Sequence, residues 1–462
     1  MGRRGHRRAL RPYNPAPLNK PAASAAERLL AAPIVPSLLR LSAPGAFLVL
    51  FQSLVSVGDT YFVGRLGTGP LAGLALVFPL LMLLQMTSAG AMGGGVSSAI
   101  ARALGSGDTH RARRLVVHAL VIATAMGLAF TALIVPLGSG IYALLGGRDE
   151  PLAHALAYSG IVFTGAVVVW ISNTLSSVLR GTGNMALPAI ALIGAAVVHL
   201  PLSASLVLGL GPAPRLGIAG AAIAYVTTFG IAALVMGTAV FRRGSTLRPH
   251  AGDWQLEARF FRDILRVGGI SVVSALQTVL TSVILTGLVG RYGAAALAGY
   301  GVGLRLELLQ IPLVFAIGQA LVVMVGTHVG AGHAARAKRI AWTGAALAAS
   351  ISLAIGLVVT LVPRIWVGLF SSDPQVLEAG SLYLRTVAPF YPFLAAAMAL
   401  YFASQGAGRV LLPVLSGTAR LGIVVVGGAL AASLGAIFAV IAAGLAVFGV
   451  TTMLIVWRAR WG

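Results

Sequence analysis

Two carboxylates stand inside long apolar runs of this sequence. Asp59 lies in SVGDTYFVGRLG and Glu307 lies in GLRLELLQIP. An ionised side chain in hydrocarbon costs about 3 kcal/mol or more, so such acids usually face a helix-bundle interior or an aqueous cavity, where they often belong to ion or proton pathways. We therefore predict that Asp59 binds a cation or a proton. The alternative is a structural role near the end of its helix, with Arg65 as its partner.

The composition is that of an integral membrane protein. Of the 462 residues, 58% are hydrophobic and 10% are charged. Apolar runs of about 20 residues recur along the chain, which is the length that spans a bilayer. The formal charge of +22 does not indicate nucleic-acid binding, because Arg and Lys form short clusters between the apolar runs. The chain has no cysteine, which excludes disulfides and thiolate metal sites.

The apolar runs predict an all-α integral membrane protein with about twelve transmembrane helices. The basic clusters fall in alternate loops, which lie on one side of the membrane, and the opposite loops carry few basic residues. Both termini are therefore expected in the cytoplasm, with residues 1–33 as a basic cytoplasmic tail. The predicted spans are 34–64, 70–101, 114–137, 153–178, 187–210, 217–241, 264–290, 294–326, 338–362, 376–403, 411–434 and 437–457.

The two halves of the chain repeat each other. VGRLGTGPLAG at 63–73 matches VGRYGAAALAG at 289–299, an offset of 226 (291 − 65) between their arginines. Two further motif pairs have an offset of 225 (330 − 105). Since each half holds an even number of spans, the repeat is parallel. We predict an N-terminal six-helix lobe at 34–241, a cytoplasmic linker at 242–263 and a C-terminal six-helix lobe at 264–458.

The repeat also supplies a control for Asp59. Its counterpart in the second half is Leu285, at an offset of 226 (285 − 59). The fold therefore does not require an acid at this position.

The ordered motifs VGDTYFVGRLG, RGTGN and GAGHAARAKR resemble those of the multidrug and toxic compound extrusion (MATE) family, over about residues 34–458. The resemblance is closer to the DinF-like bacterial type than to the sodium-coupled NorM branch. It implies a secondary antiporter, not an enzyme, that exports organic, drug-like compounds. We expect these compounds to be cations. It also implies a monomer in the bacterial inner membrane, with no cofactor beyond an ion gradient and no nucleic-acid partner.

The resemblance assigns roles to individual residues. Asp59 matches the first-helix acid whose protonation or cation binding is tied to substrate release. Pro44 matches a proline at which that helix bends, as the lost backbone hydrogen bond of proline permits; a tolerated kink without switching is the alternative. The family's amino-terminal cation cluster falls on Asn173, His199, Ser203 and Tyr225.

The histidine bears on which ion is exchanged. Sodium prefers hard oxygen ligands, whereas imidazole offers nitrogen and titrates near neutral pH. His199 therefore favours proton coupling, with sodium coupling as the alternative. Ser203 follows it by four residues, on the same helical face. A hydrogen-bonded core residue is the other reading of His199.

In the second half, the stretches VVSALQTVLTSVILTG and VAPFYPFLAAAMALYFAS contain no acid, which argues against a NorM-type sodium site there; Gln277 lies near the seventh-helix position of such a site. Glu307 has a functional and a structural interpretation. It could titrate or contact a cationic substrate, or it could form an ion pair with Arg420. We expect the ion pair, because buried acids usually have a partner. Gln277, Glu307 and Arg420 thus form a possible second-lobe polar site. The glycines of GAMGGGVSSA predict close helix packing rather than a phosphate cradle.

Other functions remain open in the sequence. A lipid-linked oligosaccharide flippase of the same superfamily would line its cavity with cationic residues for pyrophosphate, and only Arg305 and Arg420 are candidates. A membrane transferase or hydrolase would need a nucleophile or metal motif, and neither HExxH nor GxSxG occurs. A passive channel is the third alternative.

Overall fold

The computed structural model describes residues 25–461, and all regular secondary structure in that range is helical. The predicted all-α fold is therefore confirmed, while most of the predicted basic tail lies outside the described residues. The helices are α1 (Ala25–Ala31), α2 (Ile34–Gly64), α3 (Thr68–Gln85), η1 (Met86–Met92), α4 (Gly93–Gly105), α5 (Thr109–Leu144), α6 (Asp149–Thr164), α7 (Ala166–Gly181), α8 (Ala186–Leu208), α9 (Ile218–Phe241), η2 (Ala251–Trp254), α10 (Ala258–Gly290), α11 (Ala294–Gly330), α12 (Ala334–Leu361), α13 (Pro363–Val367), α14 (Pro374–Val387), η3 (Ala388–Phe390), α15 (Tyr391–Gly406), α16 (Leu411–Leu430) and α17 (Leu434–Arg458).

The number of spans agrees with the prediction. Within residues 25–461, 11 helices are long and apolar enough to cross a membrane, and the bent pair α6 and α7 raises the number to 12.

Three of the predicted spans are interrupted. A π-helix, η1, separates α3 from α4, a type of distortion that is frequent at functional sites. A 51° bend at Gly165 separates α6 from α7, and a Cβ at this glycine would lie 2.7 Å from Val226 of α9, so the bend follows a close helix approach. The 3-10 turn η3, which contains Pro389, separates α14 from α15. Sequence periodicity did not reveal these breaks, because each flanking helix stays apolar.

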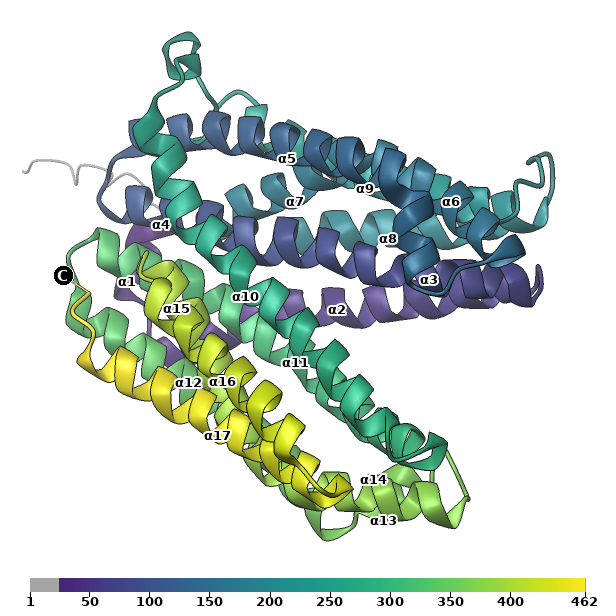
Figure 1. Cartoon of the computed structure of the whole chain (residues 1–462). Helices are drawn as coiled ribbons and strands as arrows, with labels where there is room; N and C mark the ends of the chain where they lie inside the picture. The colour runs from purple at the N-terminus through teal and green to yellow at the C-terminus, as the bar shows by residue number, and fades with distance from the viewer. Residues whose placement is uncertain (1–24, 462) are drawn as a thin grey trace, which may run out of the picture.

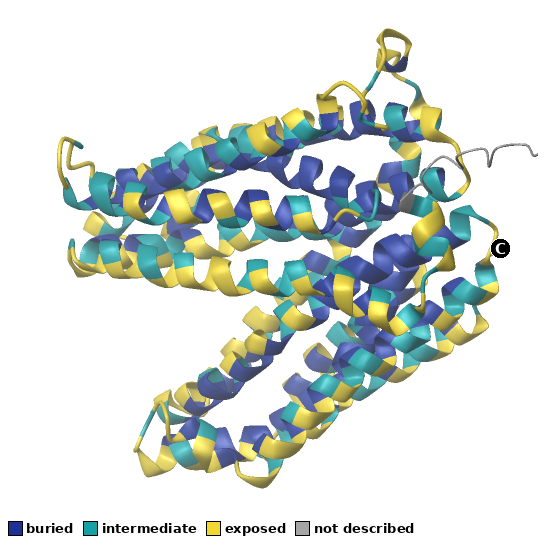
Figure 2. Ribbon diagram, turned by 180° about the vertical axis from the view of Figure 1, so that it is seen from behind, coloured by how far each residue is buried: buried dark blue, intermediate teal, exposed yellow. Residues whose placement is uncertain are grey.

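The helices form two lobes, α2–α9 and α10–α17, which touch at one end and diverge toward the other (Figure 1). We call the end where α4 crosses α11 the closed end, and the opposite end the open end. The described C-terminus and the linker between the lobes lie at the closed end (Figure 1). Buried residues fill the interior of each lobe and the junction at the closed end (Figure 2).

The opening helix of each lobe starts inside the other lobe. Leu38 of α2 is fully buried and packs in the core of the second lobe with Leu321. Reciprocally, Phe260 and Ile264 of α10 belong to the core of the first lobe. The C-terminal boundary of the predicted linker, 242–263, is therefore too late in the sequence, since α10 begins at Ala258 and its first turns are packed. A movement of one lobe must therefore bend or displace the opening helix of the other.

The linker is fixed to the start of α5 by charge. The Asp253 carboxylate is almost fully buried; it accepts a hydrogen bond from the backbone N–H of His250 (2.8 Å) and lies 3.3 Å from both Arg113 Nε and His110 Nε2. Burial disfavours the charged form, but the backbone hydrogen bond and the neighbouring positive groups outweigh it and lower the pKa of Asp253. The linker is therefore part of the first lobe.

The exchange of helix ends generates a stability prediction. Leu38→Ala would leave a cavity in the core of the second lobe and is expected to cost about 2–4 kcal/mol. Leu50→Ala on the same helix is the matched control, because Leu50 is 64% exposed and its truncation creates no cavity. Thermal unfolding in detergent measures both. Equal midpoints for the two variants would contradict the anchoring of α2 in the second lobe.

Candidate functional site

Asp59 lies in a hydrogen-bonded site between α2 and α8. Its two carboxylate oxygens are each 2.9 Å from His199 Nε2, and the Ser203 hydroxyl donates to Oδ1 at 2.7 Å. The His199 side chain is 2% exposed and that of Asp59 15% exposed. The imidazole is thus enclosed, whereas the carboxylate keeps some access from outside the protein.

The local sequence makes this approach possible. Gly58 precedes the acid, and a Cβ at this position would lie 2.6 Å from the Leu200 side chain, so α8 packs directly against the backbone of α2. His199 and Ser203 stand one helical turn apart and reach the same carboxylate. Pro201 lies between them inside α8 without separating the two side chains. The grouping predicted for Asp59, His199 and Ser203 is therefore present in the structure.

The other imidazole nitrogen shows where the hydrogens lie. The Thr228 hydroxyl donates to the backbone oxygen of Ala224 (2.7 Å), so its lone pairs accept from His199 Nδ1 at 2.8 Å. With a hydrogen on Nδ1, a neutral imidazole presents a lone pair to the carboxylate from Nε2. Two facing acceptors at 2.9 Å repel each other. One proton must therefore lie between Nε2 and Asp59, as an imidazolium beside a carboxylate or an imidazole beside a carboxylic acid.

Asn173 and Tyr225 belong to a second network. Asn173 Nδ2 donates to Gln85 Oε1 (3.0 Å) and to the Ser88 hydroxyl (2.8 Å), and Gln85 Nε2 donates to the Tyr225 hydroxyl (2.7 Å). Among the described residues, no hydrogen bond joins this network to Asp59. The five residues predicted for ion coupling therefore fall into two hydrogen-bonded groups, both in the first lobe.

Sequence reasoning missed three members of these networks: Gln85, Ser88 and Thr228. Gln85 had a signal, because it is the sole amide side chain in the apolar run 70–101. Thr228 follows Tyr225 by three residues and so shares its helical face. Ser88 sits in the π-helix η1, where α-helical periodicity gives no guide to side-chain direction.

The alternative prediction that Arg65 is the partner of Asp59 is wrong. Arg65 Nη1 donates to the hydroxyl of Tyr61 at 3.3 Å, and its guanidinium lies 6.0 Å from that ring. The kink residue Pro44 lies inside α2, next to Gly45, whose added Cβ would lie 3.4 Å from Ala316 of the second lobe. Pro44 therefore separates the part of α2 anchored in the second lobe from the part that carries Asp59.

The expected ion pair of Glu307 with Arg420 is also wrong. Glu307 accepts a hydrogen bond from the Tyr383 hydroxyl (3.1 Å), and among residues 25–461 no cation lies within ion-pairing distance of it. The Arg420 guanidinium instead lies 6.0 Å from the Phe448 ring, close enough for a cation–π contact. Gln277 donates to the Thr418 hydroxyl at 2.7 Å, so these three predicted residues do not form one site.

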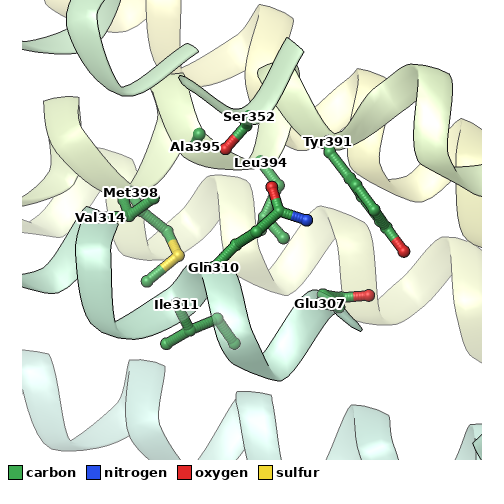
Figure 3. A pocket seen from close by; sticks show the side chains of 9 residues that line it. All are labelled: Glu307, Gln310, Ile311, Val314, Ser352, Tyr391, Leu394, Ala395 and Met398. Carbon is green, nitrogen blue, oxygen red and sulfur yellow. The ribbon is translucent and has the colours of Figure 1, made fainter. Parts of the chain in front are cut away.

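Glu307 lines a small cavity in the second lobe. Figure 3 shows Gln310 pointing from α11 toward residues of α12 and α15, with Tyr391 on the facing wall. The space is about that of a single water molecule. Gln310 Nε2 and the Tyr391 hydroxyl are buried and have no hydrogen-bond partner among the described residues. This small cavity, with a few polar side chains in a largely apolar lining, is the second candidate site. It is lined by Glu307, Gln310, Ile311, Val314, Ser352, Tyr391, Leu394, Ala395 and Met398.

The two helical lobes and the partly buried carboxylate between α2 and α8 are those of a two-lobed membrane transporter. The chain matches the MatE family model over residues 44–205 and 270–430, and it belongs to this family of MATE transporters. The two matched segments lie at corresponding places in the two lobes, as the internal repeat requires.

Relatives and solved structures agree with this assignment. The chain is 28% identical over 356 residues to a FAD transporter of Shewanella oneidensis, covering 77% of this chain and 78% of the relative. It is 26% identical over 382 residues to a probable multidrug resistance protein NorM of Thermotoga maritima, covering 82% and 81%. A MATE protein in the bent conformation superposes with a TM-score of 0.87 at 23% identity, covering 94% of this chain and 97% of that chain. The last comparison shows the shared fold.

The second network generates a prediction for Gln85. Gln85→Met keeps the approximate shape but leaves Asn173 and Tyr225 without their amide partner, which costs about 1–3 kcal/mol for each buried group left unpaired. Gln52→Met is the control, because Gln52 is exposed on α2. Thermal unfolding should show a lower midpoint for Gln85→Met alone. If both variants melt together, the network does not stabilise the first lobe.

Proposed function

We propose that this protein is a secondary antiporter that exports organic compounds in exchange for protons. The observation that carries the proposal is the 2.9 Å contact of His199 Nε2 with both carboxylate oxygens of Asp59, a geometry that requires a shared proton. Ser203 and Thr228 hold the carboxylate and the imidazole in place. Loss of the shared proton would leave two facing acceptors that repel each other, so proton binding is coupled to the approach of α2 to α8. The partial exposure of Asp59 gives that proton a route from the solvent.

The path of helix α2 links proton binding to movement. Its first half is anchored in the second lobe and its second half carries Asp59 against α8 of the first lobe. A change in the charge of Asp59 alters the attraction between α2 and α8, and the bend at Pro44 transmits that change to the second lobe. The two lobes then alternate between the arrangement described above, in which they meet at the closed end, and an arrangement in which they meet at the open end.

The chemistry at Asp59 favours protons over sodium. Both carboxylate oxygens already face an imidazole nitrogen, and a sodium ion would have to displace that nitrogen or share the carboxylate with it. The second lobe has no acid at the places expected for a NorM-type site, and we accordingly place the chain nearer the DinF-like type. Sodium coupling is the competing proposal.

The relatives suggest two substrate classes. Multidrug resistance proteins among them support the export of organic, drug-like compounds, and the family resemblance favours cations. The FAD transporter at 28% identity supports a flavin-like anion as the second candidate. A lipid-linked oligosaccharide flippase is less well supported, because its two candidate cations contact aromatic rings: Arg420 lies against the Phe448 ring and Arg305 against the Phe370 ring.

The orientation follows from the basic residues. Arg and Lys concentrate in the loops at the closed end, so we propose that this end and both termini face the cytoplasm of a bacterial inner membrane. A monomer suffices, because both candidate sites are built from a single chain.

Proteoliposomes with separately imposed proton and sodium gradients test the coupling. Ethidium and FAD serve as the cationic and the anionic probe. We expect a proton gradient to drive uphill transport of at least one probe, and Asp59→Asn to reduce that transport at least tenfold, because an amide cannot exchange a proton. His199→Gln should weaken the proton dependence, since the amide cannot carry the shared proton.

The control is Glu378→Gln, which neutralises an exposed acid outside both networks. Wild-type transport by Asp59→Asn would refute the role of this acid. Sodium-driven transport with no response to protons would refute the role proposed for His199.

Glu307 has a separate test. We propose a structural role for its carboxyl group, as the acceptor for Tyr383 inside the second lobe. Glu307→Gln retains an acceptor oxygen and is expected to keep at least half of the transport rate, whereas Glu307→Leu should lower the thermal midpoint. A folded Glu307→Gln protein that has lost its proton dependence would instead establish a second proton site.

A further inference from the structure

Helices α4 and α11 cross at the closed end with no room for a side chain at two positions. A Cβ on Gly105 would overlap the backbone oxygen of Thr327, and a Cβ on Gly330 would overlap the backbone oxygen of Arg102. Both overlaps are with backbone, which no side-chain rotation can relieve. The two helices therefore approach each other as closely as they do because both residues are glycines.

The two contacts are equivalent under the internal repeat. Gly330 and Gly105 are 225 residues apart (330 − 105), and so are Thr327 and Arg102 (327 − 102). Each glycine rests on the backbone three residues before the other glycine. The crossing is thus self-complementary, like the interface of a two-fold dimer, although it lies within one chain. Both contacts must form together, because each glycine is seated by the same approach of the same two helices.

The surrounding contacts are of a kind that can open. Beside the glycines, a Cβ on Gly326 would lie 3.0 Å from Cβ of Ala101. The Ser98 hydroxyl and Arg102 Nη1 donate to the backbone oxygen of Gly406 at 3.1 and 3.2 Å. Among the described residues, no ion pair joins α4 to α11. Opening breaks a few hydrogen bonds to backbone and separates the small cluster in which Ala101 packs with Met185 and Val323.

We propose that the reciprocal contacts of Gly105 with Thr327 and of Gly330 with Arg102 form the gate that seals the closed end, and that they separate as one unit when the lobes rock. The gate rests on the proposed function and names the residues that contact each other when this end is closed and separate when it opens. It does not depend on which ion is exchanged. A self-complementary contact of two glycines has a closed state and an open state with little between them, which suits a two-state switch.

A methyl group at either glycine is expected to hold the gate open. Because the chain has no cysteine, Ala101→Cys provides a single reporter thiol at a fully buried position of the crossing. In this background, Gly105→Ala and Gly330→Ala should each raise the rate of maleimide labelling at least tenfold, by similar factors. Gly194→Ala is the control, since a Cβ there meets nothing within 4 Å. Unchanged labelling in both variants would overturn the proposal.

A disulfide crosslink across the crossing provides a second test of the gate. The pair Ala101→Cys and Gly326→Cys brings two Cβ atoms to about the separation that a disulfide requires, after a small shift. Oxidation should remove both thiols from maleimide titration of the denatured protein and stop transport, and dithiothreitol should restore both. Transport at the wild-type rate by fully crosslinked protein would refute the gate. Crosslinking and labelling need no proton gradient, so their outcome is independent of proton coupling.

Discussion

The hydrogen bonds from His199 and Ser203 to Asp59 are the interaction on which the first lobe depends. A carboxylate in an apolar helix is too costly to leave without partners, and α8 supplies both hydrogen-bond partners from one helical turn. Gly58 is the residue that allows α8 to come this close. Thr228 then fixes the imidazole and leaves one proton between ring and carboxylate. Packing, hydrogen bonding and the proposed proton binding therefore involve the same few residues.

The exchange of helix ends connects this site in the first lobe to the second lobe. The α2 helix starts in the core of the second lobe, contains Pro44 and ends against α8, while the start of α10 packs reciprocally in the core of the first lobe. The lobes are thereby joined through two crossing helices and a glycine-lined contact. A joint of this kind keeps the lobes registered yet leaves few strong contacts between them to be broken during movement.

The repeat has diverged where function differs and has been retained where the lobes meet. Leu285 replaces the acid of the first lobe, and Glu307 lies in a cavity with Tyr391 and Gln310 instead of a carboxylate–histidine pair. By contrast, Gly105 and Gly330 keep the same role in both halves, because each supplies half of one symmetric contact. Chemistry requires one copy of a site, whereas a self-complementary contact requires two copies of a surface.

The sequence by itself determined the all-α membrane fold, the repeat and the importance of Asp59, because apolar length, a constant offset and a rare intramembrane charge are each visible along one chain. Only the tertiary structure decided partners. It joined Asp59 to His199, assigned Asn173 and Tyr225 to Gln85, and separated Glu307 from Arg420. Which side chains meet depends on helix rotation, on the π-helix η1 and on glycine contacts between helices far apart in sequence, and these are set by packing in three dimensions rather than by spacing along the chain.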